Sequence, residues 1–97
     1  MDIQTLLHHG RTIWGDQNLT LSEIIVRLNV SLGDLARIAR NSDKDRTNSS
    51  REDLEREMGN IIFSTIRWCD DLGLNPEICI ERAMECQKRF AEQNLHR

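Results

Sequence analysis

The chain has 97 residues and a net charge of −3, and 38% of its residues are hydrophobic. This length fits one domain with a modest core, and a single proline with five glycines provides little material for a turn-rich β fold. The arginines are spread along the chain, unlike the clustered basic footprint of a nucleic-acid-binding protein. We therefore expect one all-α domain over residues 1–97 without a nucleic-acid partner.

The cysteines and the first residues indicate a cytoplasmic protein. Three cysteines are an odd number for a disulfide scaffold, and their helical spacing suits buried thiols in a reducing compartment. No apolar run approaches the ~20 residues that span a bilayer. Asp2 stands where a signal peptide would have basic residues. We expect a protein with no membrane partner.

Apolar periodicity predicts the first two helices. Residues 2–14 carry apolar side chains at helical intervals, and residues 15–18, GDQN, end this helix. Thr20 and Glu23 form a capping-box pattern, which predicts a second helix from there to about Arg40. Its main apolar stripe comprises Leu21, Ile24, Ile25, Leu28, Leu32, Leu35 and Ala39.

The second helix is apolar on two sides, because Val26, Val30 and Ile38 lie off its main stripe. Such a helix is usually buried on both sides, and a small all-helical chain often buries the surplus against a second copy. Phe63 lies off the stripe of the third helix in the same way. Val30, Ile38 and Phe63 are therefore candidate residues of a subunit interface.

A polar loop over residues 41–50 precedes the last two helices. Ser50, with Asp53 three residues later, predicts the start of the third helix, and Gly73 is expected to end it. Its apolar face carries Leu54, Met58, Ile61, Ile62, Thr65, Cys69 and Leu72. Asn75 before Pro76 is an N-cap pattern for a fourth helix. The expected architecture is a four-helix bundle.

A polar ridge lies beside the apolar face of the third helix and comprises Asp53, Glu57, Asn60, Ser64 and Asp71. On the second helix Asp34 stands between apolar neighbours, which is costly unless it finds a cation, a donor or a metal. Gly33 and Gly59 stand next to or near these acids, although a glycine lowers the stability of a helix. Because glycine has no side chain, its presence there suggests that a helix or a ligand approaches closely. Oxygen ligands on two facing helices are typical of a divalent-metal site.

These stretches resemble the MazG-like, all-α nucleoside triphosphate pyrophosphohydrolases. VSLGDL, residues 30–35, is similar to the family's Glu-Glu-x-Gly-Glu-Leu form, and EMGN, residues 57–60, to its Glu-Leu-Gly-Asp form. Residues 61–90 are similar to the family's remaining helices, and Trp14 falls near an aromatic that lies against the base. The resemblance covers about residues 12–90.

The resemblance implies a four-helix bundle that forms a homodimer or homotetramer, and Mg²⁺-dependent hydrolysis of a (d)NTP to (d)NMP and pyrophosphate. Asp34 and Glu57 are then the catalytic acids and, with Asn60, the ligands of Mg²⁺ or Mn²⁺. Trp14, Ser31 and Ser64 are the implied substrate-binding residues. The metals in such chemistry neutralise phosphate charge and generate the nucleophile.

The acidic motifs depart from the family pattern. Val30 and Ser31 stand where the family has two glutamates, Asp34 replaces a third, and Asn60 replaces an aspartate. With two carboxylates left, the implied hydrolysis is weakened or lost. Two alternatives therefore remain open: a non-catalytic nucleotide-binding protein, and a helical dimer that binds another protein and whose acids are paired with arginines.

Overall fold

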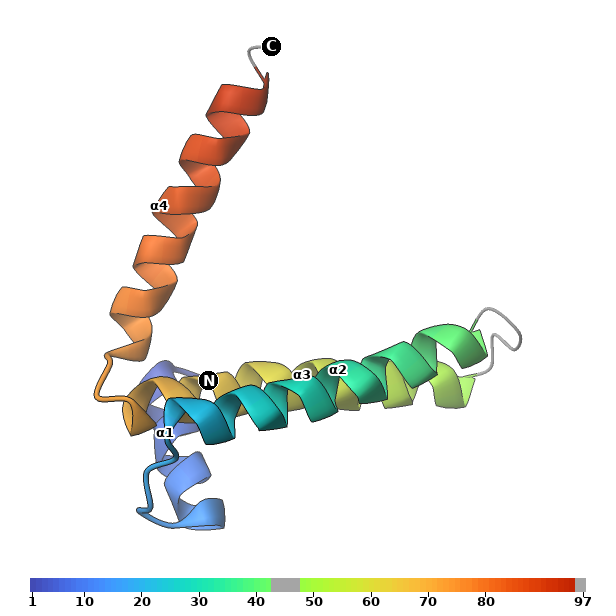
Figure 1. Cartoon of the computed structure of the whole chain (residues 1–97), viewed down its shortest axis with the longest axis horizontal. Coiled ribbons are helices and arrows are strands. Elements are labelled where there is room, and N and C mark those ends of the chain that lie inside the picture. The colour runs from blue at the N-terminus through green and yellow to red at the C-terminus, as the bar shows by residue number, and fades with distance from the viewer. Residues whose placement is uncertain (43–47, 96–97) are drawn as a thin grey trace.

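The structure is a computed structural model that describes residues 1–42 and 48–95. Within these ranges it has four helices and no strand, which confirms the all-α class and the number of helices. They are α1 (Ile3–Trp14), α2 (Leu21–Ser42), α3 (Asn48–Asp71) and α4 (Pro76–Leu95) (Figure 1). None of the helices in the described part is both long and apolar enough to cross a bilayer.

Side-chain caps fix the starts of the first two helices. The Asp2 carboxylate accepts a hydrogen bond of 2.7 Å from the Thr5 backbone N–H, ahead of α1. At α2 the predicted capping box is confirmed, because the Thr20 N–H donates to Glu23 Oε1 and the Glu23 N–H donates to Thr20 Oγ1. Gly15 follows α1 with a φ of 84°, where a left-handed residue ends the helix as expected.

The turn between α3 and α4 also follows the sequence signals. Gly73 has a φ of 73°, and its N–H donates to the Asp70 carbonyl while the Leu74 N–H donates to the Cys69 carbonyl. Asn75 Oδ1 accepts from the Glu77 N–H at 2.9 Å, so this residue caps α4. The turn therefore sets where α4 leaves α3.

The predicted loop over residues 41–50 was too long. α2 continues through Ser42, and α3 already begins at Asn48, so Ser50 lies inside the helix and the start expected there is wrong. The polar residues at these positions show no apolar periodicity, so the sequence gives no helical signal there. Propensity is only a weak guide to where a helix ends, because the structural context of a residue often overrides it. Residues 43–47 lie outside the described part of the chain.

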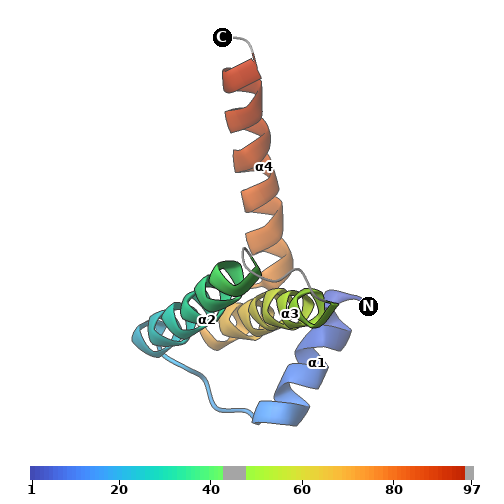
Figure 2. The ribbon, with the colours of Figure 1, turned by 90° about the vertical axis from the view of Figure 1, so that its right-hand side faces the viewer.

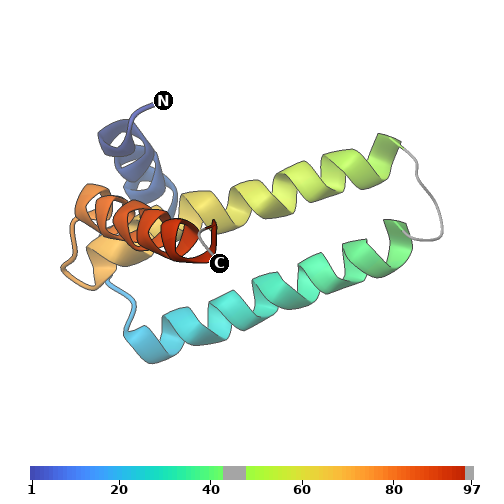
Figure 3. The same ribbon diagram turned by 90° about the horizontal axis from the view of Figure 1, so that it is seen from above.

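The helices are arranged around an antiparallel pair formed by α2 and α3, which lie side by side along their length (Figure 3). α1 lies on the other side of α3, against the half of α3 that precedes α4 (Figure 2). α4 contacts α3 near the turn and then projects away from the other three helices (Figure 1). One chain therefore leaves an open angle between α3 and α4.

The core of the single chain is small. Among the side chains in the described part, only three hydrophobic ones are buried, namely Ile24, Ile66 and Trp68. Most of the expected stripe of α2 is exposed, as Leu21, Ile25 and Leu32 are, and so are Leu54, Met58 and Ile62 of α3. The predicted apolar faces exist, but the chain does not cover them with its own helices.

An ion-pair cluster fastens α1 to α3. Arg11 Nη2 lies 2.6 Å from Asp70 Oδ2 and 2.8 Å from Asp71 Oδ1. The hydrogen bond with Asp70 raises the pKa of the Arg11 guanidinium, so the charge persists. Gly10 is buried beside this cluster, where its backbone lies against the aliphatic stem of Arg67. The close approach expected of a glycine occurs here.

The close approach expected at Gly33 and Gly59 is absent among the described residues, because a Cβ added at either glycine would meet no atom of another element or of a side chain within 4 Å. Replacing Gly59 with alanine should raise the free energy of unfolding by about 0.5–1 kcal/mol, since alanine loses less backbone entropy in a helix. Urea denaturation of the variant checks this value. Unchanged or lower stability would indicate that a ligand or second copy fills the space beside Gly59.

Candidate functional site

Among the cavities that the described residues form, two contain the predicted site residues and lie along the α2–α3 pair. The larger has a volume of about 500 Å³ and is formed where α1 meets α2 and α3. It is lined by Ile13, Trp14, Arg27, Val30, Ser31, Asn60, Phe63, Ser64, Arg67 and Trp68. We call it the Trp14 cavity. It joins residues from three helices that are far apart in the sequence.

The three residues predicted to bind substrate all line the Trp14 cavity. Ser31 and Ser64 are half-buried on α2 and α3, and Trp14, at the end of α1, is 63% exposed. Asn60, predicted as a metal ligand, lines the same cavity. The helical register of α2 and α3 therefore brings these polar groups together with an aromatic ring.

Two arginines give the Trp14 cavity its charge. The guanidinium carbon of Arg67 lies 5.3 Å from the centre of the Trp14 ring, which is cation–π distance. Burial lowers the pKa of Arg67, and its nearest carboxylate is Asp71, at 4.0 Å. Arg27 of α2 makes no ion pair within 4 Å among the described side chains. The cavity is therefore cationic and has polar and aromatic walls.

Both arginines were missed as binding residues in the sequence, where they were considered only as partners for the acids. The spacing in the sequence could have indicated them. Arg27 precedes Ser31 by four residues and Arg67 follows Ser64 by three, which places each arginine on the same helix face as a predicted substrate-binding serine. Trp68, also missed, lines the cavity and is buried, and its indole Nε1 has no hydrogen-bond partner in the described structure. A buried donor without an acceptor is a place where a ligand or water can add one.

The smaller cavity, of about 230 Å³, contains the predicted acids. It is lined by Asp34, Arg37, Ile38, Asp53, Arg56 and Glu57, and we call it the acid cavity. Asp34 on α2 and Glu57 on α3 are thus brought to one cavity, as the sequence predicted for two facing helices. Asp53, which the sequence placed on the same ridge as Glu57, adds a third carboxylate.

Arginines neutralise most of the charge in the acid cavity. Arg37 forms an ion pair with Asp34 one turn earlier on α2. Arg56 Nη2 lies 2.8 Å from Asp53 Oδ1, and its Nε lies 3.7 Å from Glu57 Oε1. Three acids and two arginines leave one net negative charge, so the cavity holds its carboxylates without requiring a metal.

The donor types suit Mg²⁺, but the side chains are not arranged as a metal site. The described residues contain no cluster of three or more His, Cys, Asp or Glu residues that could hold a metal ion. Asn60 Nδ2 donates to Glu57 Oε2 at 3.4 Å, which links the two cavities. Arg37 and Arg56 therefore compete with a metal ion for the carboxylates of Asp34 and Glu57.

The candidate interface residues lie at the cavities. Val30 and Phe63 line the Trp14 cavity, and Ile38 lines the acid cavity. Val30 is exposed, whereas Ile38 and Phe63 are half-buried. Their role as an interface stays a prediction.

Comparisons of the chain with models of known protein families, with curated proteins and with solved structures gave no match.

Proposed function

We propose that the chain binds a nucleoside triphosphate in the Trp14 cavity, and that any Mg²⁺-dependent hydrolysis to the monophosphate and pyrophosphate is weak. The observation that carries the proposal is the meeting of one exposed aromatic ring, two arginines and two hydroxyls in a cavity of about 500 Å³. The resemblance to MazG-like pyrophosphohydrolases supports the same ligand class through the motifs around Asp34 and Glu57.

Trp14 is the proposed contact for the base. Its indole is largely exposed at the cavity edge, and an aromatic face can stack on any nucleobase. Because Arg67 already lies over the Trp14 ring, the base would stack on the part of the ring that Arg67 does not cover. The hydrophobic wall formed by Val30 and Phe63 excludes water beside the base.

Arg27 and Arg67 are the proposed contacts for the phosphates. A guanidinium binds phosphate oxygens through two parallel N–H groups and stays charged at all physiological pH values. Arg27 is exposed and makes no ion pair within 4 Å among the described side chains, and the more distant charge of Glu23, one turn earlier on α2, acts on it, so that a bound phosphate would break no close ion pair. Ser31 and Ser64 add hydroxyl donors from the two helices that form the cavity floor.

Mg²⁺ is proposed to bind together with the triphosphate. Mg²⁺ is usually held by one or two carboxylates together with substrate phosphates. Asp34, Glu57 and Asn60 would supply the protein oxygens, and the ion would neutralise phosphate charge and activate a water. Arg37 and Arg56 already balance these acids, and this competition is the physical reason to expect weak hydrolysis.

Thermal unfolding with nucleotides tests the binding. At a ligand concentration of about 100 times Kd, binding to the native state alone adds about 2.7 kcal/mol of stability. For a chain of this size that corresponds to a rise in Tm on the order of 10 °C. The assay uses common ribo- and deoxyribonucleoside triphosphates with Mg²⁺, with Mn²⁺ and with EDTA.

Release of pyrophosphate, measured on the same samples, tests the catalytic part. Stabilisation with little or no release would support a binding protein whose hydrolysis is lost. Stabilisation with metal-dependent release would support a weak pyrophosphohydrolase. If no triphosphate changes Tm or is hydrolysed, the proposed ligand class is wrong.

A further inference from the structure

We propose that Cys69 of α3 and Cys79 of α4 form a reversible disulfide bond, which ties the start of α4 to the end of α3. Both thiols are free and half-buried in the structure. They line a groove of about 390 Å³ between the two helices, here called the α3–α4 groove. Neither residue lines the Trp14 cavity or the acid cavity, so the inference does not rest on the proposed function.

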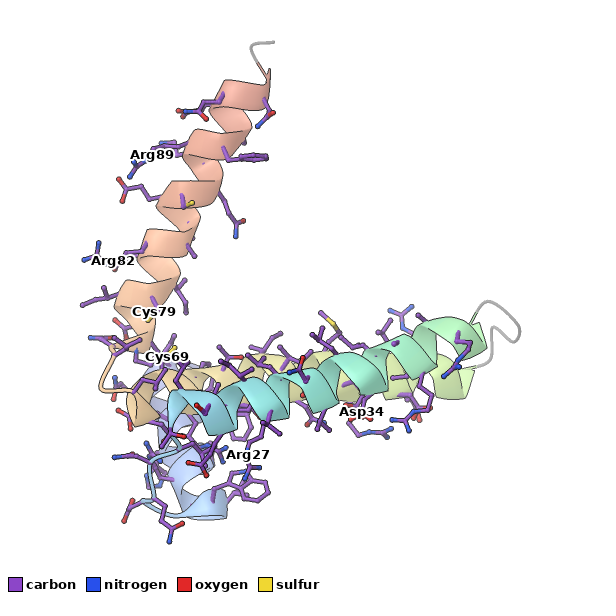
Figure 4. The ribbon with its side chains drawn as sticks, in the orientation of Figure 1. Arg27, Asp34, Cys69, Cys79, Arg82 and Arg89 are labelled. Carbon is purple, nitrogen blue, oxygen red and sulfur yellow. The ribbon has the colours of Figure 1, made fainter. Side chains whose placement is uncertain are left out.

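The turn between the two helices holds both cysteines in place. The Cys69 carbonyl accepts hydrogen bonds from the Leu72 N–H, at 3.2 Å, and from the Leu74 N–H, at 2.9 Å. The Cys79 N–H donates to the Asn75 carbonyl at 3.0 Å, in the first turn of α4. Only four residues separate α3 from α4, so each cysteine lies within one helical turn of the junction (Figure 4).

The two thiols contact each other in the α3–α4 groove. Burial, and next a hydrogen bond with the Cys79 thiol, raise the pKa of the Cys69 thiol. From a hydrogen-bonded contact, a small rotation of the side chains brings two sulfur atoms to the S–S bond length of about 2.05 Å. The walls of the groove carry no charged residue. A disulfide has no charge and no polar hydrogen, so this apolar surrounding accommodates it without the loss of a hydrogen-bond partner for a charged group.

Cys86 is not a partner for this bond. It follows Cys79 by seven residues on α4, which places it about 10 Å further along the helix axis. The Cα atoms of two bridged cysteines are at most about 7 Å apart. Cys86 is exposed and does not line the α3–α4 groove. It therefore serves as an internal control for oxidation of an exposed thiol in the same chain.

The oxidant is a small disulfide such as oxidised glutathione. The thiolate of one cysteine attacks a sulfur of the small disulfide, which releases one small thiol and leaves a mixed disulfide. The other cysteine gives up its proton and attacks the protein sulfur of the mixed disulfide, which releases the second small thiol. The protein loses two hydrogen atoms, and the small disulfide gains them as two thiols. A reducing compartment reverses the reaction, so the bond forms only as conditions become oxidising.

The bond fixes the direction of α4. This helix contacts α3 near the turn and then projects away from the other three helices (Figure 1). Its orientation therefore depends on the few residues at the junction. A covalent link between the first turn of α4 and the last turn of α3 restricts this junction, and it also restricts the unfolded chain. Oxidation should therefore stabilise the arrangement that the structure shows.

Equilibration of the wild-type chain in glutathione redox buffers tests the inference. The remaining thiols are alkylated, and trypsin then releases residues 68–82, with Cys69 and Cys79, and residues 83–88, with Cys86, as separate peptides. Peptide 68–82 should become two hydrogen atoms lighter, carry no alkyl or glutathione group, and regain both thiols with dithiothreitol. The equilibrium constant for this bond should be at least about 10-fold higher in the folded chain than in guanidinium chloride, because the native contact holds the sulfur atoms together.

Serine variants identify the bonded pair. Cys69→Ser and Cys79→Ser should each abolish the bond, whereas the matched control Cys86→Ser should retain it. In the Cys86→Ser chain, which lacks the exposed thiol, oxidation should raise Tm by roughly 10 °C. The same treatment should leave Tm of the other two variants without a comparable rise. Circular dichroism checks that the variants keep their helix content.

Three results contradict the inference. If peptide 68–82 carries two alkyl or two glutathione groups after equilibration with excess oxidised glutathione, the thiols do not pair in the folded chain, and this result needs no variant. An equilibrium constant no higher than in guanidinium chloride means that the native structure does not bring the sulfur atoms together. A Tm that oxidation leaves unchanged or lowers means that the bond distorts the junction of α3 and α4.

Discussion

Replacing Asp71 with asparagine should lower the free energy of unfolding by about 2–4 kcal/mol. The Asp71 side chain is 0% exposed and lies between Arg11 of α1, at 2.8 Å, and Arg67 of its own helix, at 4.0 Å. The Arg67 side chain is only 9% exposed, so removal of the carboxylate leaves a buried guanidinium without its counter-charge. Breaking a buried ion pair from one side is strongly destabilising, whereas exposed pairs contribute little.

Asp70 provides the matched control, because it contacts the same arginine from a neighbouring position. Its side chain is 41% exposed, and Arg11 Nη2 lies 2.6 Å from its Oδ2. Asp70→Asn should cost about 1 kcal/mol or less. Denaturant unfolding of both variants gives the comparison. Equal losses would mean that burial of Asp71 does not set the strength of the junction between α1 and α3.

The second large effect is expected at Arg27. Reversing its charge with Arg27→Glu should weaken nucleotide binding at least about 30-fold, or about 2 kcal/mol, since hydrogen bonds to charged groups contribute about 1.5–3 kcal/mol. Arg27 lines the Trp14 cavity and makes no ion pair in the described structure, so its substitution removes no structural contact of that kind. Titration calorimetry with a triphosphate measures the change.

Arg82→Glu is the control for this variant. It makes the same change of charge on α4, and Arg82 lines neither the Trp14 cavity nor the acid cavity (Figure 4). A general effect of net charge on an anionic ligand would weaken both variants alike. Loss of binding in Arg27→Glu alone would locate the phosphates in the Trp14 cavity, and unchanged affinity would place them elsewhere.

Helix ends could be predicted from the sequence because their signals are local. The Thr20–Glu23 capping box, the left-handed Gly73 and the Asn75 cap each depend on groups within a few residues, and each forms as expected. The start of α3 was misplaced for the same reason, since Ser50 offers a cap pattern that a longer helix does not use. Local sequence patterns allow a helix to start at several positions, and the surrounding structure determines which of them is used.

The candidate site could be predicted only in part. The register of two helices brings Asp34 and Glu57 to one cavity, and Ser31 and Ser64 to the other. The sequence could not show which arginines enter which cavity, because each arginine reaches several partners through a long, flexible stem. Arg37 and Arg56 pair with the acids, whereas Arg67 lies over Trp14. The position of α4 was also unpredictable, since the apolar faces do not specify which chain covers them.

The two cavities on one side of the α2–α3 pair and the groove between α3 and α4 are lined by different residues. Arg27 and Asp34 point to one side, and Cys69, with the rest of the α3–α4 groove, lies on the other (Figure 4). A substitution in the walls of either cavity on the first side therefore leaves the residues of the groove on the second side unchanged. The two surfaces can change independently of each other in sequence.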